Sequence, residues 1–281
     1  MSEYPSFSVA MSVYKNDKAE YVERALQSIT KEQTVKPNEI IVVVDGPVPE
    51  SVDEVLKKYQ ETYNCFELIR LPENKGLGNA LKIAVDKCSH SLIARMDSDD
   101  ISLPTRFEQQ LQCFIEQEDL DIVGGDITEF IGEESNVVGK RDVPVTDTAI
   151  KAYMKKRCAF NHVSVMYKKE AVLKVGNYQD WFWNEDYYLW IRMQMGGCIF
   201  ANTGTTLVNV RVGEDMYRRR GGRRYYKSEK DLQKYMYKNK MISFGTYFVN
   251  VLKRFIVQIL LPNRLRGWLF RKFARSSGKK S

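Results

Sequence analysis

The chain has 281 residues, of which 43% are hydrophobic, 12% aromatic and 28% charged, a composition typical of a globular protein with a sizeable core. These values exclude a disordered, collagen-like or disulfide-scaffold protein. The net charge of +7 is unevenly spread, because residues 1–210 carry a net −9 and residues 211–281 a net +16. The five cysteines are widely spaced and form no CxxC pair, which favours buried thiols in a reducing compartment over zinc or disulfides.

Strand-like and helical patterns alternate along the first 130 residues. Runs of branched apolar residues predict strands at residues 7–13, 39–45, 66–70, 91–96 and 121–130. Between them, apolar residues at helical spacing predict helices near residues 19–29, 52–63, 81–85 and 104–115. Alternation with short connections indicates an α/β fold, with a mainly parallel sheet that helices cover on both faces.

The second half of the chain is less regular. A strand is predicted at residues 163–167, and a helix is expected to start near Asn184. After Arg211 the chain is rich in Arg, Lys and Tyr and has helical spacing.

In a parallel sheet, ligands bind beyond the carboxyl ends of the strands. The polar residues that follow the predicted strands are therefore the first candidates for a functional site. They are Tyr14, Asp45, Lys75 in the loop after the third strand, and an acidic cluster after Met96.

The strongest local signal is the tetrapeptide DSDD at residues 97–100, directly after the predicted strand at 91–96. Three carboxylates in four residues repel one another and lower stability unless a cation is bound. Their hard oxygen atoms favour Mg²⁺ or Mn²⁺, usually shared with substrate phosphates. The alternative is a solvated acidic turn that caps the helix after Pro104, a role that Asp100 or Ser102 can fill alone.

A second acidic pair, Glu185 and Asp186, follows an aromatic run that contains Trp181 and Trp183. Carboxylates at the start of a helix are stabilised by its dipole, which is the simplest structural interpretation. The functional interpretation is a general base beside aromatic rings that hold the face of a sugar.

Three further features allow a structural or a functional role. Asp45-Gly46 is typical of a turn, although a carboxylate at the end of a strand also suits an N–H group of a base. The loop NKGLGN at residues 74–79 resembles a phosphate loop but lacks the P-loop spacing. His162 has no partner His or Cys at ligand spacing, which favours an orienting hydrogen bond over a structural metal ligand.

These motifs follow one another in the order found in a known family. Seven segments carry the similarity: FSVAMSVYKND, IIVVVDGP, ENKGLGNALKIAV, LIARMDSDDISLPTRFEQQ, DIVGGDITEF, FNHVSVMYKKEAV and NEDYYLWIRM. Over about residues 5–215 the chain resembles the family 2 glycosyltransferases, which are inverting, use nucleotide sugars and have a GT-A fold. Within that family, its sequence is most similar to bacterial exopolysaccharide and O-antigen enzymes of the amylovoran type.

The resemblance implies a domain organisation. A glycosyltransferase domain would cover residues 1–215, with a donor half at about 5–130 and an acceptor half at about 131–215. A basic, amphipathic helical extension would follow at residues 216–281.

The resemblance also implies roles on the donor side. Tyr14 and Asp45 would hold the uracil of a UDP-sugar, with Lys75 nearby. Asp97 would face the ribose or the sugar, and Asp99, with Asp97, would hold Mn²⁺ or Mg²⁺ on the diphosphate. The sequence has DGP at residues 45–47 where many members have DGS, and Asn79 where arginine often follows the glycine.

On the acceptor side, the resemblance makes Asp186 the catalytic base and Glu185 its support. His162, Trp181 and Trp183 would contact the acceptor.

The implied reaction moves a hexose or N-acetylhexosamine from a UDP-sugar to a saccharide acceptor, expected to be lipid-linked, in surface polysaccharide biosynthesis. The base removes a proton from the acceptor hydroxyl, the metal stabilises the departing UDP, and one displacement inverts the anomeric configuration. A sugar-1-phosphate nucleotidyltransferase is an alternative, but its glycine-rich signature near the first strand is absent. A catalytically inactive, membrane-attached nucleotide-sugar-binding protein is another, and the retained carboxylates argue against it.

The basic end of the chain has an amphipathic pattern. Its apolar stripe consists of Phe244, Phe248, Val251, Leu252, Phe255, Ile256, Ile259 and Leu260. The cations around it are Lys253, Arg254, Arg264, Arg266, Arg271, Lys272 and Arg275. This pattern favours an anionic membrane surface, and no nucleic-acid-binding motif accompanies the charge. The alternative is that the stripe packs on the catalytic domain or in a homodimer.

The amino terminus shows no basic leader with an apolar stretch, and no run reaches the ~20 apolar residues of a membrane span. We therefore expect a cytoplasmic protein that is peripheral on the inner face of a bacterial plasma membrane.

Overall fold

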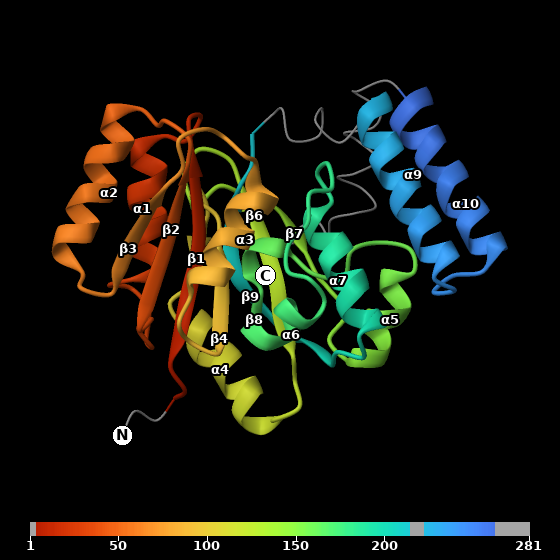
Figure 1. Ribbon diagram of the computed structural model, residues 1–281, viewed down its shortest axis with the longest axis horizontal. Helices are drawn as coiled ribbons and strands as arrows, with labels where there is room; N and C mark the ends of the chain where they lie inside the picture. Colours follow the sequence, from red (N-terminus) through yellow and green to blue (C-terminus); the bar gives the residue numbers. More distant parts are fainter. Residues whose placement is uncertain (1–3, 214–221, 262–281) are drawn as a thin grey trace.

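A nine-stranded sheet runs through the computed structural model, which describes residues 4–213 and 222–261 (Figure 1). The strand order is β3-β2-β1-β4-β8-β6-β9-β5, and β7 pairs with β6 outside this path. The strands are β1 (Phe7–Tyr14), β2 (Glu39–Asp45), β3 (Phe66–Arg70), β4 (Leu92–Met96), β5 (Ile101–Ser102), β6 (Ile122–Phe130), β7 (Val137–Arg141), β8 (Met166–Lys168) and β9 (Phe200–Arg211).

Helices cover both faces of this sheet. Within the described residues, the helices are α1 (Ala19–Ile29), α2 (Glu50–Thr62), α3 (Leu77–Lys87), α4 (Arg106–Glu116), α5 (Asp147–Met154), α6 (Lys169–Lys174), α7 (Glu185–Met195), α9 (Arg223–Lys238) and α10 (Phe244–Phe255). A 3₁₀ turn, η1 (His162–Ser164), precedes β8, and a π turn, η2 (Ile256–Leu260), follows α10.

The amino-terminal half of the sheet is parallel, as the alternating pattern predicts. β1 lies between β2 and β4, and β3 pairs with β2, all in the same direction. Alternate residues of β2 face two separate cores: Val42 and Val44 pack with α1, α2 and α4, whereas Ile41 and Val43 pack with α3 and α7. A strand buried on both faces needs an almost continuous apolar sequence, which explains the run EIIVVVD.

The second half of the sheet is mixed. β8 is antiparallel to β4 and β6, whereas β6 and β9 are parallel. The strand predicted at residues 163–167 is wrong in its first part, because His162–Ser164 form a 3₁₀ turn. The buried side chains of Asn161 and Ser164 both donate to the carbonyl of Gly125, at 2.8 and 3.1 Å, and these bonds hold the turn against β6.

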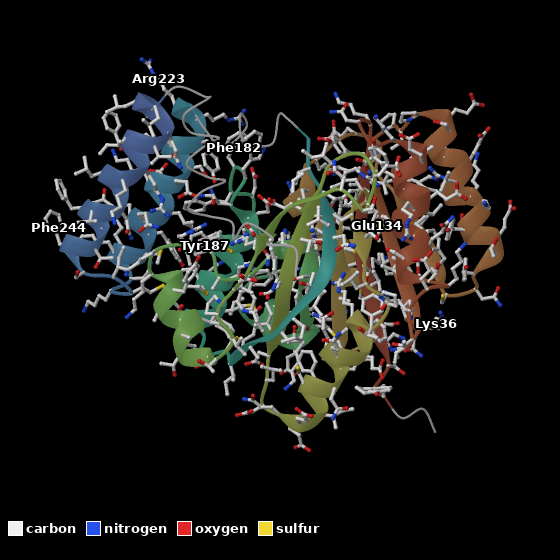
Figure 2. The ribbon with its side chains drawn as sticks, turned by 180° about the vertical axis from the view of Figure 1, so that it is seen from behind. Lys36, Glu134, Phe182, Tyr187, Arg223 and Phe244 are labelled. Carbon is white, nitrogen blue, oxygen red and sulfur yellow. The ribbon has the colours of Figure 1, made fainter. Side chains whose placement is uncertain are left out.

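The helices α9 and α10 lie side by side next to α5 and α7 (Figure 1). Leu232 and Met236 of α9 are fully buried in the same core as Trp190 of α7. α10 packs on α9, and Figure 2 shows Phe244 at the outer edge of this helical pair. No helix within residues 4–213 and 222–261 has both the length and the apolar sequence needed to cross a bilayer. The cations predicted at Arg264, Arg266, Arg271, Lys272 and Arg275 lie outside the described residues.

Candidate functional site

The carboxyl ends of β1, β2 and β4 meet at one edge of the sheet. Tyr14 ends β1 beside Asp45, which ends β2, and Asp97 follows β4 directly. β8 runs antiparallel to β4, so the turn η1 that precedes it brings His162 to the same edge. The predicted residues therefore converge where the parallel topology places a ligand site.

Asp45 organises the loop that opens α3. Its carboxylate accepts hydrogen bonds from the backbone N–H of Lys75 at 2.7 Å and of Gly76 at 2.9 Å. It also accepts one from the side chain of Asn74 at 2.9 Å, and Asp45 is only 2% exposed. The structure thus shows Asp45 holding the loop, and contact of Asp45 or Lys75 with a base stays a prediction.

Gly46 permits the close approach of this loop. Its φ is +83°, and a Cβ atom at this position would lie 2.6 Å from the backbone nitrogen of Asn74. Both the left-handed backbone and the lack of space therefore require glycine.

We expect Gly46→Ala to destabilise the protein more than Gly197→Ala does. Gly197 has the same φ of +83°, but a Cβ atom there would have no neighbour within 4 Å, so its substitution costs only the backbone strain of about 1–2 kcal/mol. The clash with the 73–74 backbone adds about 1–3 kcal/mol at Gly46. Urea denaturation of the two variants measures the difference, and equal losses would show that the loop moves away freely.

Asp97 is held by a buried arginine. Both nitrogens at the end of the Arg95 side chain donate to the two carboxylate oxygens of Asp97. The Arg95 side chain is 2% exposed and that of Asp97 is 34% exposed, so the carboxylate faces outward from a buried cation. A planar, two-point pair of this kind orients the carboxylate.

Asp99 and Asp100 lie in a field of negative charge. Burial, followed by the charges of Asp97 and Asp17, raises the pKa of Asp99 to about 7. Burial and the charges of Asp99 and Asp97 raise the pKa of Asp100 well above its ordinary value. Asp100 accepts a hydrogen bond from the backbone N–H of Arg211 at 2.8 Å, so it has a structural partner.

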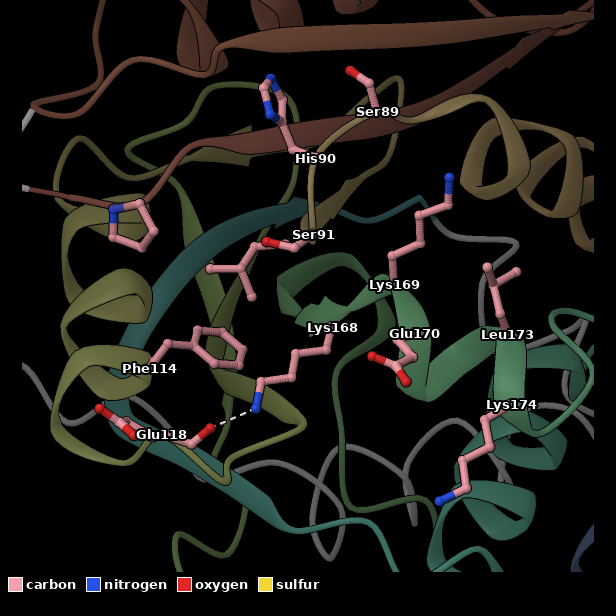
Figure 3. A pocket seen from close by; sticks show the side chains of 12 residues that line it. Ser89, His90, Ser91, Phe114, Glu118, Lys168, Lys169, Glu170, Leu173 and Lys174 are labelled. Carbon is pink, nitrogen blue, oxygen red and sulfur yellow. Dashed lines mark hydrogen bonds between the residues drawn. The ribbon is translucent and has the colours of Figure 1, made fainter.

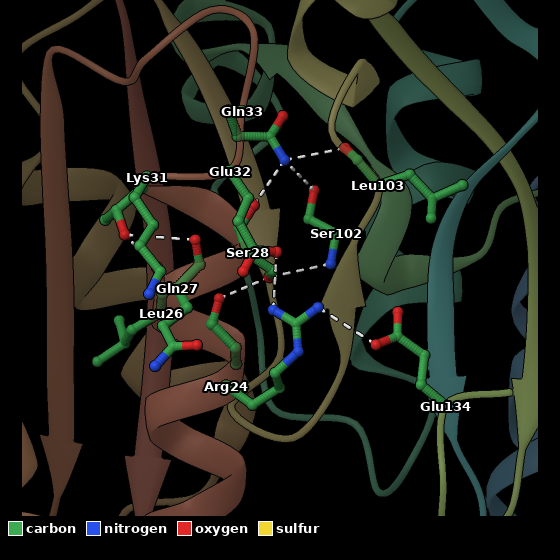
Figure 4. Close-up of polar contacts among 12 residues, drawn as sticks. Arg24, Leu26, Gln27, Ser28, Lys31, Glu32, Gln33, Ser102, Leu103 and Glu134 are labelled. Atoms are coloured by element: carbon green, nitrogen blue, oxygen red, sulfur yellow. Dashed lines mark hydrogen bonds and ion pairs between the residues drawn. The ribbon is translucent and has the colours of Figure 1, made fainter.

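A polar network fixes the segment that follows this cluster (Figure 4). Gln33 donates to the hydroxyl of Ser102 at 3.1 Å and to the carbonyl of Leu103 at 2.9 Å. The N–H of Ser102 donates to the hydroxyl of Ser28 on α1 at 3.0 Å. Arg24 pairs with Glu32 and Glu134 on the same side. The acidic turn is thereby anchored at its carboxyl end.

Sequence reasoning missed three residues of this site. Asp17 accepts a hydrogen bond from the N–H of Tyr14 at 2.8 Å, and burial raises its pKa to about 6. Arg95 is a charged residue inside an otherwise apolar strand, a signal that could have marked it. Arg211 donates to the carbonyl of Asp99 at 3.2 Å and stacks on Tyr21, contacts that no local pattern announces.

The second acidic pair begins α7 and faces the same site. Burial and then the charge of Asp186 raise the pKa of Glu185 to about 7, while Asp97 raises it further and Arg95 lowers it. A Cβ atom on Gly78, in the first turn of α3, would lie 3.3 Å from the Cβ of Glu185. The charge of one acidic motif therefore shifts a pKa in the other, although the two are almost 90 residues apart in the chain.

Asp186 lies against a buried thiol. The Sγ atom of Cys158 lies 3.9 Å from a carboxylate oxygen of Asp186. Burial and this carboxylate raise the pKa of Cys158 to about 12, so the thiol keeps its proton.

The predicted acceptor residues have different surroundings. The Nε2 atom of His162 is 2.9 Å from the hydroxyl of Tyr178, and burial together with Arg95 lowers the pKa of His162 well below its ordinary value. Trp181 donates its indole N–H to the carbonyl of Ser228 and packs on Tyr188 with 4.4 Å between ring centroids. Trp183 is 48% exposed and adopts a φ of +55°. Acceptor contact stays a prediction for all three residues.

The carboxylates suit a divalent cation that a substrate helps to hold. Within residues 4–213 and 222–261, no three His, Cys, Asp or Glu side chains form a complete metal-binding group. Asp99 nevertheless offers an oxygen donor near the charges of Asp97 and Asp17, and burial followed by these charges raises its pKa to about 7. Mg²⁺ and Mn²⁺ bound with nucleotides commonly take one or two carboxylates and complete their shell with phosphates and water.

A cavity of about 750 Å³ lies elsewhere on the molecule (Figure 3). It is at the amino-terminal end of β4, lined by Leu92, Phe114 and the side chains of Lys168 and Lys169. Both lysines donate to backbone carbonyls, Lys168 to Glu118 at 2.5 Å and Lys169 to Cys88 at 2.6 Å. None of the candidate site residues lines this cavity.

Comparison with known proteins identifies the fold. The solved mannosyltransferase PcManGT from Pyrobaculum calidifontis, in complex with GDP-Man and Mn²⁺, has a TM-score of 0.62 at 14% identity, covering 94% of this chain and 72% of that chain. The predicted GT-A fold class is thereby confirmed.

Comparison of sequences identifies the family. The chain is 35% identical over 271 residues to the UDP-Gal:alpha-D-GlcNAc-diphosphoundecaprenol beta-1,3-galactosyltransferase of Escherichia coli, covering 96% of this chain and 97% of that protein. It is 34% identical over 271 residues to the amylovoran biosynthesis glycosyltransferase AmsE of Erwinia amylovora, covering 95% of this chain and 98% of that protein. The model of glycosyl transferase family 2 matches residues 8–182, and the chain belongs to this family.

Proposed function

We propose that the protein is a metal-dependent, inverting glycosyltransferase that moves a hexose or N-acetylhexosamine from a UDP-sugar to a lipid-linked saccharide in surface polysaccharide biosynthesis. The observation that carries the proposal is the convergence of the DSDD turn and the Glu185-Asp186 pair at the carboxyl ends of the parallel strands. The similar E. coli protein is named for a UDP-Gal donor and a diphosphoundecaprenol-linked acceptor, which supports this choice of substrates.

On the donor side, Tyr14, Asp45 and Lys75 hold the uracil end. Asp45 acts mainly by shaping the loop at residues 74–76, since its carboxylate already accepts three hydrogen bonds from that loop. Asp97, oriented by Arg95, faces the ribose or the sugar, and its outer lone pairs can also contact the cation. Asp99 holds Mn²⁺ or Mg²⁺, which when bound stabilises the negative charge that grows on the departing UDP.

On the acceptor side, Asp186 removes the proton from the attacking hydroxyl. Glu185 supports Asp186 from the neighbouring position. The pKa of Glu185 is raised to about 7, so this carboxyl is partly protonated beside Asp186 near neutral pH. His162, Trp181 and Trp183 contact the acceptor in this proposal. Direct attack on the side opposite to UDP inverts the anomeric configuration.

A coupled assay tests the proposal. Purified protein with UDP-galactose, Mn²⁺ and a synthetic diphospholipid-linked GlcNAc should release UDP only when the acceptor is present, beyond slow donor hydrolysis. The anomeric coupling constant of the product should show inversion by NMR. A retained configuration, release of pyrophosphate from UTP and a sugar phosphate, or nucleotide-sugar binding without turnover on any UDP-sugar would each overturn the proposal.

We also propose that α10 docks on an anionic membrane. Its apolar stripe is exposed: the exposed fraction is 62% for Phe244, 57% for Phe248 and 45% for Leu252. Contiguous apolar patches on a protein surface commonly mark sites that bind a membrane or a partner. Lys253 is exposed beside the stripe. Arg254, predicted as a surface cation, instead pairs with Glu229 and is 13% exposed on its side chain.

Replacing Phe244, Phe248 and Leu252 with serine is expected to weaken binding to anionic vesicles at least ~10²-fold. Each such side chain contributes about 1.5–3 kcal/mol when it leaves water, and ~1.4 kcal/mol is a factor of ten. Flotation with phosphatidylglycerol vesicles at low and high salt measures the loss of vesicle binding. The control replaces Val137 and Val138 of β7, which are 49% and 48% exposed, with serine. Equal flotation of both variants would contradict membrane docking, and loss of a dimer would assign the stripe to a second copy.

A further inference from the structure

One serine of α9 holds the loop that leads into the candidate base. The hydroxyl of Ser228 donates to the carbonyl of Phe182 at 2.6 Å and accepts from the side-chain amide of Asn184 at 3.0 Å. The carbonyl of Ser228 accepts the indole N–H of Trp181 at 3.2 Å. Three residues of the loop at 181–184 are thus bonded to one residue that is 44 or more positions away in the chain.

The start of α7 lacks its usual local support. Asn184 is the N-cap residue of α7, but its side chain makes no hydrogen bond to the backbone of the helix. Asparagine in this position normally accepts from the first free N–H groups of the helix. Here its amide is turned to Ser228, so the first turn, which carries Glu185 and Asp186, takes its position from α9.

The loop also holds a strained residue. Trp183 has a φ of +55°, an unfavourable conformation for a bulky side chain. Such strain persists only where the surroundings over-determine the backbone. The bonds of Ser228 to the carbonyl of Phe182 and to the side-chain amide of Asn184 hold the two residues that flank Trp183.

α9 is a fixed point from which to hold the loop. Ser228 is 7% exposed, and Leu232 and Met236, on the same face, are fully buried in the main core. The neighbouring Glu229 pairs with Arg254 of α10, which also donates to the carbonyl of Lys156 at 2.9 Å. α9 is therefore held to the rest of the protein by its buried apolar side chains and by the ion pair between Glu229 and Arg254.

We propose that Ser228 is a positioning residue for the acceptor-activating pair, and that α9 is a working part of the catalytic site. This inference rests on the proposed function, because it assumes that Glu185 and Asp186 act on the acceptor. Ser228 touches neither substrate nor the reacting atoms. It sets the loop and the first turn of α7, so that Asp186 lies at the distance that proton transfer requires.

Steady-state kinetics of Ser228→Ala test the proposal on the full-length protein. We expect kcat for transfer to fall roughly 10- to 100-fold, the range expected for a catalytic group displaced by about 1 Å. The KM for UDP-galactose and the affinity for UDP with Mn²⁺ should stay within about twofold, because the bonds of Ser228 go to the loop at 181–184 and the donor side is built on β1, β2 and β4. Ser228→Thr, which keeps a hydroxyl, should recover most of the loss, and Lys230→Ala, at an exposed site of the same helix, should behave as wild type.

Two further measurements separate positioning from general damage. Amide hydrogen exchange should accelerate over residues 181–188 in Ser228→Ala and not over the strands β1, β2 and β4. Asn184→Ala removes one of the same bonds, so its effect on kcat should be largely non-additive with that of Ser228→Ala. If Ser228→Ala does not fold, Asn184→Ala alone decides by the same kinetic outcomes.

Unchanged kcat, or an equal loss of kcat and of donor affinity, would overturn the positioning role. Absence of transfer by the wild-type protein would instead overturn the proposed function, and the two failures are therefore distinguishable.

Discussion

Asp186→Asn is expected to lower the rate of sugar transfer by at least ~10² while leaving the affinity for the UDP-sugar almost unchanged. The amide keeps the size of the side chain but cannot take the proton from the acceptor hydroxyl. Asp186 lies in the first turn of α7 and is assigned to the acceptor, whereas the proposed donor contacts come from β1, β2 and β4, so donor binding should not depend on it. Single-turnover transfer and calorimetric binding of UDP with Mn²⁺ measure the two quantities separately.

Glu185→Gln is the matched comparison for this prediction. Its carboxyl has a pKa of about 7 because of burial and the charge of Asp186, so it is partly protonated near neutral pH and the substitution should cost less. If Glu185→Gln proves far more damaging than Asp186→Asn, the base is Glu185 and Asp186 is its support.

Asp99→Ala is expected to abolish both metal-dependent binding of UDP and transfer. In the proposed site the cation links the protein to the diphosphate, and Asp99 is the carboxylate of the turn that is assigned to hold it. Asp97 is bonded to Arg95 through both of its oxygens, and Asp100 accepts the N–H of Arg211. Without Asp99, UDP should bind equally weakly with and without Mn²⁺.

Isothermal calorimetry of UDP with Mn²⁺, with Mg²⁺ and with EDTA checks this result. Asp119→Ala serves as the control, because it removes an exposed carboxylate just before the amino-terminal end of β6. Wild-type metal-dependent affinity in Asp99→Ala would exclude Asp99 from the metal site and leave Asp97 as its ligand.

The sequence by itself determined the parallel half of the fold. The predicted strands at 39–45 and 66–70 agree with β2 and β3 to the residue, and the helix predicted near 19–29 is α1. These elements have local sequence patterns. A strand buried on both faces is continuously apolar, and an amphipathic helix repeats an apolar residue every three or four positions. The topological rule for parallel sheets then located Tyr14, Asp45 and Asp97 at one edge without any coordinates.

Only the tertiary structure decided the second half and the inner contacts of the site. β9 was not predicted, because its half-exposed sequence FANTGTTLVNVR depends on pairing with β6, about 80 residues earlier in the chain. Arg95 beneath Asp97, the charge of Asp97 on Glu185, and Ser228 on the loop at 181–184 are likewise decided by packing. A sequence period records which face a residue occupies, whereas the partner of a buried polar group depends on which distant elements fold against it. For this reason the sequence identified the acidic motifs, and the folded chain showed what holds them in place.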